Sequence, residues 1–192
     1  MKMRLGLAAV FFGSLALAAT ASATVTPIAQ NGDPYYGDCP GRITGVALQG
    51  DEQADVIVGT ERADRLRGRG GNDTIDGLGA GDCIEGGKGH DTIFGGDGND
   101  FIQGSEGNDT ISGNGGDDRI QGNRGNDVVN GGDGNDRLSG GPGRDEINGG
   151  EGNDTILAAD GDRDVVDCGA GEDTAYVDKR DVVSNCEEVI RQ

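Results

Sequence analysis

One branched aliphatic residue recurs every nine positions through the middle of the chain. In most copies at least one flanking residue is polar, as in T-I-S at 110–112 and F-I-Q at 101–103. Because side chains alternate across a β-strand, the middle residue points one way and its two neighbours point the other way. The pattern therefore predicts short strands that each bury one side chain. The predicted inward residues are Ile57, Leu66, Ile75, Ile84, Ile93, Ile102, Ile111, Ile120, Val129, Leu138, Ile147 and Ile156.

The six residues between successive strands are too few for a crossover helix and return. They are rich in glycine, which reaches turn conformations that other residues adopt only with strain. Two repeats then form one coil, with strands in two facing sheets. Sorting the inward residues by this two-repeat step gives two columns, beginning at Ile57 and Leu66, and both columns are apolar throughout. We therefore expect an all-β roll with a thin apolar interior.

An aspartate stands two residues before each inward aliphatic residue and five residues after a glycine. Turns do not require a repeated carboxylate, and stacking at about 4.8 Å would form two files of like charge. Calcium binds about six to eight oxygen ligands, from carboxylates and backbone carbonyls. A cation between two stacked turns can collect an aspartate from each turn and carbonyls from both. The predicted calcium ligands are Asp55, Asp64, Asp73, Asp82, Asp91, Asp100, Asp109, Asp118, Asp127, Asp136, Asp145 and Asp154.

The spacing also predicts the number of calcium sites. Each edge of the roll would carry six turns with up to five gaps between them, which gives about ten sites in all. The first turn on each edge, QGDEQAD and VGTERAD, lacks glycine at its second and fourth positions. We therefore expect Asp55 and Asp64 to be weaker ligands, which leaves about eight well-formed sites.

Composition alone would suggest disorder, because the chain has 39 glycines, few aromatic residues and a net charge of −19. A solvated glycine-rich linker or a disordered acidic tract does not explain a pattern that keeps its phase at three positions over the whole array. The charge is unsuited to nucleic acid, whose phosphates require Lys and Arg. We interpret it as capacity for calcium.

Copies such as GGDGNDFIQ at 95–103, GGDGNDRLS at 131–139 and GGEGNDTIL at 149–157 resemble RTX, or haemolysin-type, calcium-binding repeats. The resemblance covers residues 50–158. It implies a right-handed parallel β-roll, or β-solenoid, in which calcium is held by the sixth-position aspartate and by carbonyls of neighbouring turns. The ending DVVDCGAGEDTAYVDKRDVVSNCEEV resembles small secreted actinobacterial versions of these proteins.

The flanks of the array predict an exported chain. Residues 1–23 have the form of a secretory signal peptide, with Lys2 and Arg4 before an apolar segment and an A-S-A cleavage site at 21–23. The apolar segment is shorter than the roughly 20 residues of a membrane span. We therefore expect a signal peptide, a leader and capping half-coil, a repeat roll and a C-terminal cap of degenerate repeats, with an extracellular location. The predicted boundaries are 1–23, 24–49, 50–158 and 159–192.

Both ends of the array depart from the repeat. In GRITGVALQ at 41–49, Val46 occupies the aspartate position and Leu48 the inward position, which predicts a half-coil without metal. After Asp154 the phase slips by one residue, and Asp164 and Asp173 then resume the nine-residue spacing. We expect Val166 and Ala175 to point inward there. The stretch 160–164, D-G-D-R-D, lacks the glycine and the final glutamate of an EF-hand loop.

Four cysteines in an exported chain predict two disulfides. Cys168 and Cys186 are separated by the length of two repeats, which is one coil, so we expect them to stack and bond. Cys83 lies at an outward position and would then bond to Cys39 of the leader. Free thiols are the alternative.

The sequence favours a secreted, calcium-dependent β-roll protein with a structural, surface or matrix role, and not an enzyme, because the roll and caps fill the chain after the signal peptide. An ice-binding solenoid is an alternative, although Thr74, Thr92 and Thr110 form only a short ladder that Val56 and Val128 interrupt. An accessory or remnant module of a secreted enzyme is another. The only histidine, His90, replaces the usual Asn of its turn, and we expect it to be exposed.

Overall fold

The computed structural model describes residues 26–27 and 43–192, and within these ranges the regular secondary structure consists of strands alone. The predicted all-β parallel roll is confirmed. The predicted signal peptide, most of the leader and Cys39 lie outside the described residues. The described chain contains no helix long and apolar enough to cross a membrane.

The strands form two sheets that share the roll. The ten-stranded sheet runs in the order β1(Thr26–Pro27), β2(Ala47–Gln49), β4(Arg65–Gly70), β6(Cys83–Lys88), β8(Phe101–Glu106), β10(Arg119–Arg124), β12(Arg137–Ser139), β14(Thr155–Leu157), β16(Thr174–Val177) and β18(Glu188–Arg191). The eight-stranded sheet contains β3(Val56–Thr60), β5(Thr74–Leu78), β7(Thr92–Asp97), β9(Thr110–Gly115), β11(Val128–Asp133), β13(Glu146–Glu151), β15(Val165–Ala170) and β17(Val182–Ser184).

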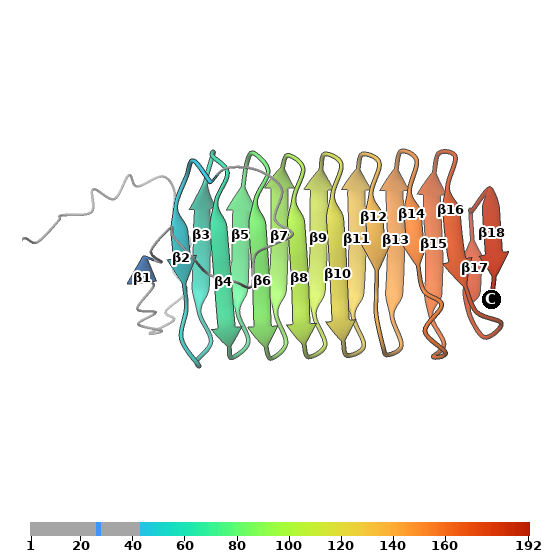
Figure 1. Ribbon diagram of the computed structural model, residues 1–192, viewed down its shortest axis with the longest axis horizontal. Coiled ribbons are helices and arrows are strands. Elements are labelled where there is room, and N and C mark those ends of the chain that lie inside the picture. The colour runs from blue at the N-terminus through green and yellow to red at the C-terminus, as the bar shows by residue number, and fades with distance from the viewer. Residues whose placement is uncertain (1–25, 28–42) are drawn as a thin grey trace, which may run out of the picture.

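From β2 onward, successive strands alternate between the two sheets, so the chain advances along the long axis of the roll to β18 (Figure 1). Each strand pairs in parallel with the strand one coil later, as Ile102 of β8 pairs with Ile120 of β10. Among the described strands, only β1 is antiparallel to its neighbour. Through most of the array the register step is therefore the predicted length of two repeats.

All the predicted inward residues are buried and form one apolar cluster between the sheets. The phase slip is also confirmed, because Ile147 pairs with Val166 and Ile156 with Ala175, which makes each step one residue longer than two repeats. Both Val166 and Ala175 are fully buried. The added residue lengthens a turn and leaves the interior columns continuous.

At the N-terminal end, Leu48 pairs with Leu66, and the partly buried Val46 and Leu48 pack against the apolar cluster, as the half-coil interpretation requires. At the C-terminal end, Cys168 and Cys186 form the predicted disulfide, with 5.1 Å between their Cα atoms. The strand register there is one residue shorter than two repeats, since Val166 pairs with Val183. An extra residue, Asn185, has a left-handed φ of 54° and brings Cys186 over Cys168.

Cys83 is disulfide-bonded and its side chain is buried. It follows the outward direction predicted for it, since Ile84 beside it faces the interior. Phe101, aligned with Cys83 in the next coil, is also buried at an outward position. The prediction that Cys39 is the partner falls on a residue outside the described ranges.

Candidate calcium site

All twelve predicted ligand aspartates are buried, each in the turn that precedes a strand. We number the positions of a repeat from its glycine, so that aspartate is position six and the inward aliphatic residue is position eight. Edge A denotes the turns that follow the strands of the ten-stranded sheet, and edge B the turns that follow the other sheet. The aspartates of edge A are stacked one coil apart, and those of edge B form a second file.

The Oδ1 atom of most of these aspartates is fixed by the neighbouring coil. Asp109 Oδ1, for example, accepts the backbone N–H of Asp91, and Asp127 Oδ1 accepts that of Asp109. Twelve such bonds measure 2.7 to 2.9 Å between nitrogen and oxygen. Each file of carboxylates is therefore held in place by a ladder of backbone hydrogen bonds that crosses every coil.

The Oδ2 atom of the same aspartates is buried and has no hydrogen-bond partner. Buried carboxylate oxygens without partners are costly, so they indicate a missing positive group. We call these residues the open aspartates: Asp73, Asp82, Asp91, Asp100, Asp109, Asp118, Asp127, Asp136, Asp145, Asp154, Asp164 and Asp173.

From Asp73 to Asp154, the Oδ2 atom of each open aspartate faces the glycine at position one of its own repeat. A Cβ built on Gly104 would clash with Asp109 Oδ2 and would lie 2.8 Å from the carbonyl oxygen of Gly122, one coil later. A carboxylate oxygen and a carbonyl oxygen therefore border the same small space, which no side chain can enter. Oxygen donors of these two kinds are the ligands that calcium prefers.

The turn backbone also directs carbonyl groups along the stack. At position four, Gly107 has a φ of 140°, and a Cβ there would overlap the carbonyl oxygen of Gly89 in the preceding coil. In the repeats from Gly68 to Gly149, the backbone at position two is left-handed even where the residue is not glycine. Such strain persists only where its surroundings enforce it. The non-glycine residues concerned are Arg69, Leu78, Ser105, Asn114 and Asn123.

The first turn on each edge differs from this arrangement. The N–H of Asp51 donates to Asp55 Oδ2 at 2.7 Å, and the N–H of Thr60 donates to Asp64 Oδ2. Neither position-two residue has a left-handed φ. Both Oδ2 atoms are therefore satisfied by the backbone, which gives a physical reason for the weaker ligation predicted for Asp55 and Asp64.

Two open aspartates were absent from the predicted ligand set. Asp164 and Asp173 have the same Oδ1 bond, to the N–H of Asp145 and Asp154 respectively, and the same unpartnered Oδ2. The sequence signal that could have identified them as ligands was their nine-residue spacing after the phase slip. Their turns carry fewer glycines, which concealed them from a search by the full motif.

Burial raises the pKa of most open aspartates. The pKa of Asp118 rises to about 8, that of Asp100 to about 7 and that of Asp109 to about 6. Burial is the largest cause, the backbone N–H bond opposes it, and neighbouring carboxylates add to it. The cost of holding these files ionised therefore arises first from desolvation and only then from repulsion between neighbours.

A second ladder runs outside the first, at position five. Asn72 Oδ1 accepts the N–H of His90, and His90 Nδ1 accepts the N–H of Asn108 at 2.8 Å. His90 is exposed, as predicted, and its ring nitrogen takes the place of an asparagine oxygen. This ladder explains why Asn recurs before the aspartate, which the sequence alone had left unexplained.

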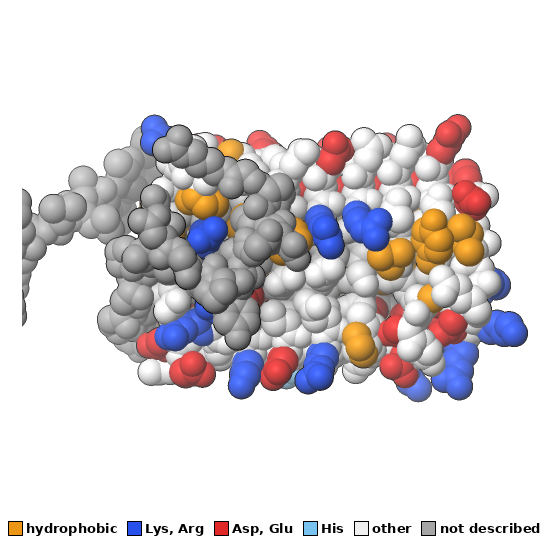
Figure 2. All heavy atoms as spheres, in the orientation of Figure 1, with side chains coloured by type: hydrophobic (Ala, Val, Ile, Leu, Met, Phe, Trp, Pro, Cys, Tyr) orange, Lys and Arg blue, Asp and Glu red, His pale blue; other side chains and the backbone are white. Residues whose placement is uncertain are grey.

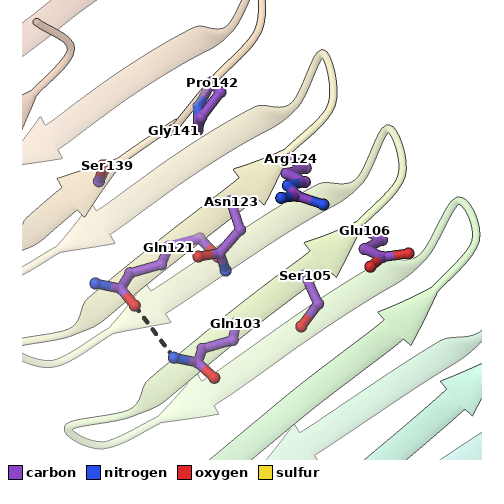
Figure 3. A pocket seen from close by; sticks show the side chains of 9 residues that line it. All are labelled: Gln103, Ser105, Glu106, Gln121, Asn123, Arg124, Ser139, Gly141 and Pro142. Atoms are coloured by element: carbon purple, nitrogen blue, oxygen red, sulfur yellow. Dashed lines mark hydrogen bonds between the residues drawn. The ribbon is translucent and has the colours of Figure 1, made fainter. Parts of the chain in front are cut away.

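The outer face of the ten-stranded sheet carries a separate groove of about 450 Å³, to which outward-facing residues of β8, β10 and β12 contribute. Gln103 and Gln121 are hydrogen-bonded across it, and Glu106 and Arg124 lie at its rim (Figure 3). Figure 2 shows charged side chains gathered along the rims of the roll. The groove offers amide and hydroxyl groups, with Glu106 as its single carboxylate.

Comparison with known proteins bears on the repeat region. A search of curated proteins finds no match. The family model for the RTX calcium-binding nonapeptide repeat (4 copies) matches six overlapping segments. These are residues 49–82, 79–111, 103–138, 112–147, 130–165 and 139–175, which together span more than half of the chain. The chain belongs to the family of RTX calcium-binding nonapeptide repeat proteins.

Proposed function

We propose that this chain is a secreted, non-enzymatic protein whose repeat roll binds calcium between the open aspartates of successive coils. The observation that carries the proposal is the set of buried, unpartnered Oδ2 atoms, which lie six on each edge. Six on an edge border five gaps, so about ten sites result, from a set that includes Asp164 and Asp173 in place of Asp55 and Asp64.

The donor set favours calcium over other cations. Carboxylate and carbonyl oxygens suit calcium and magnesium, whereas zinc prefers nitrogen and sulfur. Magnesium retains several waters and requires a small octahedral site, whereas calcium accepts irregular sets of protein oxygens. Bound calcium supplies the positive charge that the carboxylates need. The chain's own residues fix the Oδ1 atoms, aim the Oδ2 atoms into the gaps and exclude side chains from them.

Calcium then acts as a folding cofactor for the roll. Without it, the buried carboxylates must either lose their charge or remain ionised without compensation, and the latter is costly. Extracellular modules bind calcium at about 10⁻⁴ to 10⁻³ M. A chain exported through the signal peptide of residues 1–23 would therefore meet enough calcium to fold only after secretion.

A structural, surface or matrix role suits a rigid stack of this kind. The ice-binding alternative has less support. Thr74, Thr92 and Thr110 are aligned on one sheet face, but the aligned positions before and after them are Val56 and Val128. The position-three rim is also charged and irregular, since Lys88, Glu106 and Arg124 are aligned there.

The proposal is tested with the mature chain, residues 24–192, after removal of metal. Circular dichroism should report a largely unfolded chain in calcium-free buffer at pH 7.5 and a β-rich chain in millimolar calcium. Equilibrium dialysis should count about eight to ten bound ions. A β-rich chain that melts cooperatively in excess chelator would show that the roll does not need calcium to fold. Magnesium at the same concentration is the control.

A further inference from the structure

The turn between β14 and β15 breaks the repeat and brings an additional carboxylate to edge A. It comprises residues 158–164, one residue more than the turn one coil earlier, residues 140–145 between β12 and β13. Counted back from Asp164 at position six, its position two is the exposed Asp160, which has no left-handed φ, unlike the position-two residues of the regular turns from Arg69 onward. Asp160 Oδ1 accepts the N–H of Asp162 at 2.9 Å, which fixes the start of the turn.

The C-terminal cap braces this turn. The N–H of Gly161 donates to Asp178 Oδ2 at 3.0 Å, and Arg180 Nη1 donates to the carbonyl oxygen of Gly161 at 2.8 Å. The turn therefore lies beside the loop between β16 and β17, at the C-terminal end of the roll (Figure 1). Asp160 is held in position by residues of two different turns.

Asp160 approaches two buried open aspartates. One carboxylate oxygen from each of Asp145, Asp160 and Asp164 lies within 4.8 Å of the other two. Asp145 and Asp164 are 3% and 1% exposed, and their Oδ2 atoms have no hydrogen-bond partner. Asp160 is also among the neighbouring charges that raise the pKa of both residues, as expected for a carboxylate that faces them.

We propose that Asp145, Asp160 and Asp164 form a calcium site with three carboxylate ligands, to which Asp160 contributes from outside the repeat pattern. The inference rests on the proposed function, because two of the three ligands belong to the array. An ordinary gap offers two aspartates, and calcium affinity rises with the number of charged ligands. This site therefore fills at a lower calcium concentration than the other gaps. An ion bound there joins the last regular coil of edge A to the cap.

A tyrosine beside the site provides a local probe. Tyr176 and Asp160 line one recess of about 200 Å³. Tyrosine sensitises the emission of nearby terbium, a trivalent ion that replaces calcium at oxygen sites, and the transfer falls steeply with distance. The chain has three tyrosines. Replacing Tyr35 and Tyr36 with Phe leaves Tyr176 as the only donor in the full mature chain.

In this double-Phe chain, Asp160→Asn should lower the affinity for the terbium ion that Tyr176 sensitises by about tenfold or more. The affinity of calcium, measured by its displacement of that terbium, should fall by a similar factor. Asn keeps an oxygen for the N–H of Asp162, so the turn is retained. Asp162→Asn removes the same charge from the same turn and should leave the affinity unchanged. Equal affinities for Asp160→Asn and the parent chain would overturn the proposal, as would an equal loss in Asp162→Asn.

A second measurement needs no Asp160 variant. In the parent chain, which carries Phe at positions 35 and 36 and keeps Asp160, the Tyr176-sensitised emission should saturate at a lower terbium concentration than total ion uptake measured by equilibrium dialysis. Coincident curves would overturn the proposal. Circular dichroism separates this failure from a failure of the proposed function. If calcium folds the chain while the Asp160 site behaves like any other gap, only the present inference fails. If the parent chain neither binds ions nor folds in calcium, the calcium-dependent roll itself is wrong.

Discussion

The two oxygens of each open aspartate have different surroundings. Oδ1 accepts a backbone N–H from the preceding coil, whereas Oδ2 is buried without a partner, as in Asp109. Asparagine keeps the first oxygen and removes the charge from the second. This substitution therefore separates the contribution of an aspartate to the hydrogen-bond ladder from its contribution to cation binding.

We expect Asp109→Asn to lower the number of bound calcium ions by about one to two, because Asp109 borders two gaps of edge A. Asp117→Asn is the matched control. Asp117 is exposed at position five, where Asn is usual, and its Oδ1 accepts the N–H of Asn135, which Asn can also accept. Equilibrium dialysis at saturating calcium measures both counts.

The same measurement tests whether the first turn of edge A binds calcium less strongly than the later turns. Asp55→Ala should change the ion count less than Asp109→Ala, because Asp55 Oδ2 already accepts the N–H of Asp51. Equal losses from the two alanine substitutions would mean that the first turn binds calcium as the later turns do.

Leu78 is the bulkiest aliphatic residue in a left-handed conformation, with a φ of 76°. Leu78→Gly should stabilise the calcium-loaded roll by up to about 1 kcal/mol, because relief of about 1–2 kcal/mol of strain exceeds the added entropy of the unfolded glycine chain, which is about 0.5–1 kcal/mol. Urea unfolding in calcium measures the change. Val58→Gly, at an exposed strand residue with ordinary φ, should be destabilising instead. A loss of stability in Leu78→Gly would show that the strain is not relieved.

At the scale of elements, the sequence was sufficient to predict the two sheets, the buried residue of each strand and the phase slip, because one buried residue per repeat determines the register. The six residues expected between strands were too many, because most strands extend into positions one to three, as in β8 (Phe101–Glu106). The hydrogen bonds made by the turns were harder to predict from the sequence. Whether the N–H at position two reaches Oδ2 depends on the local φ, and the residue at position two does not reveal it, because neither Asp51 nor Arg69 is glycine. The cap was also hidden, since Glu187 Oε2 accepts the N–H of Asp173 and so ends the edge B ladder with a residue outside the repeat.

The C-terminal cap is closed by the disulfide between Cys168 and Cys186. Replacing both cysteines with Ser should lower the stability of the calcium-loaded chain by about 3 kcal/mol, since the bond closes a loop of 18 residues. Urea unfolding measures this loss. The ion count at saturating calcium should not change, because Cys168 lies beside the open Oδ2 of Asp154 only through its backbone carbonyl oxygen, which serine retains. A lower count would mean that the cap and the last calcium sites fold as one unit.

At the scale of the whole molecule, the carboxylates couple folding to pH. Burial raises the pKa of Asp118 to about 8 and that of Asp82 to about 7, from an ordinary value of 3.8. Between pH 3.8 and about 8, the folded state thus binds more protons than the unfolded state. The stabilisation of the calcium-free folded state by this proton binding is fully present below the ordinary pKa of 3.8, and it is lost as the pH rises through 6 to 8.

A calcium-free chain should therefore gain β-structure as the pH falls from 8 to about 4.5, and saturating calcium should make the content of β-structure nearly independent of pH over this range. Circular dichroism of metal-stripped protein, at several pH values with and without calcium, measures both effects. A calcium-free chain that is more structured at pH 8 than at pH 4.5 would contradict the sign of this linkage.

The two-repeat register also governs how the length of such a protein can change. Every coil presents the same ladder to the coil before and after it, so insertion of two repeats lengthens the roll by one strand spacing, about 4.8 Å, and disturbs no contact. Insertion of a single repeat is a different event, because it rotates everything after it by half a coil. The disulfide and the cluster around Asp160 would then move to the opposite edge. In this architecture, length varies freely in steps of two repeats, while the parity of the repeat number decides which edge each end of the molecule faces.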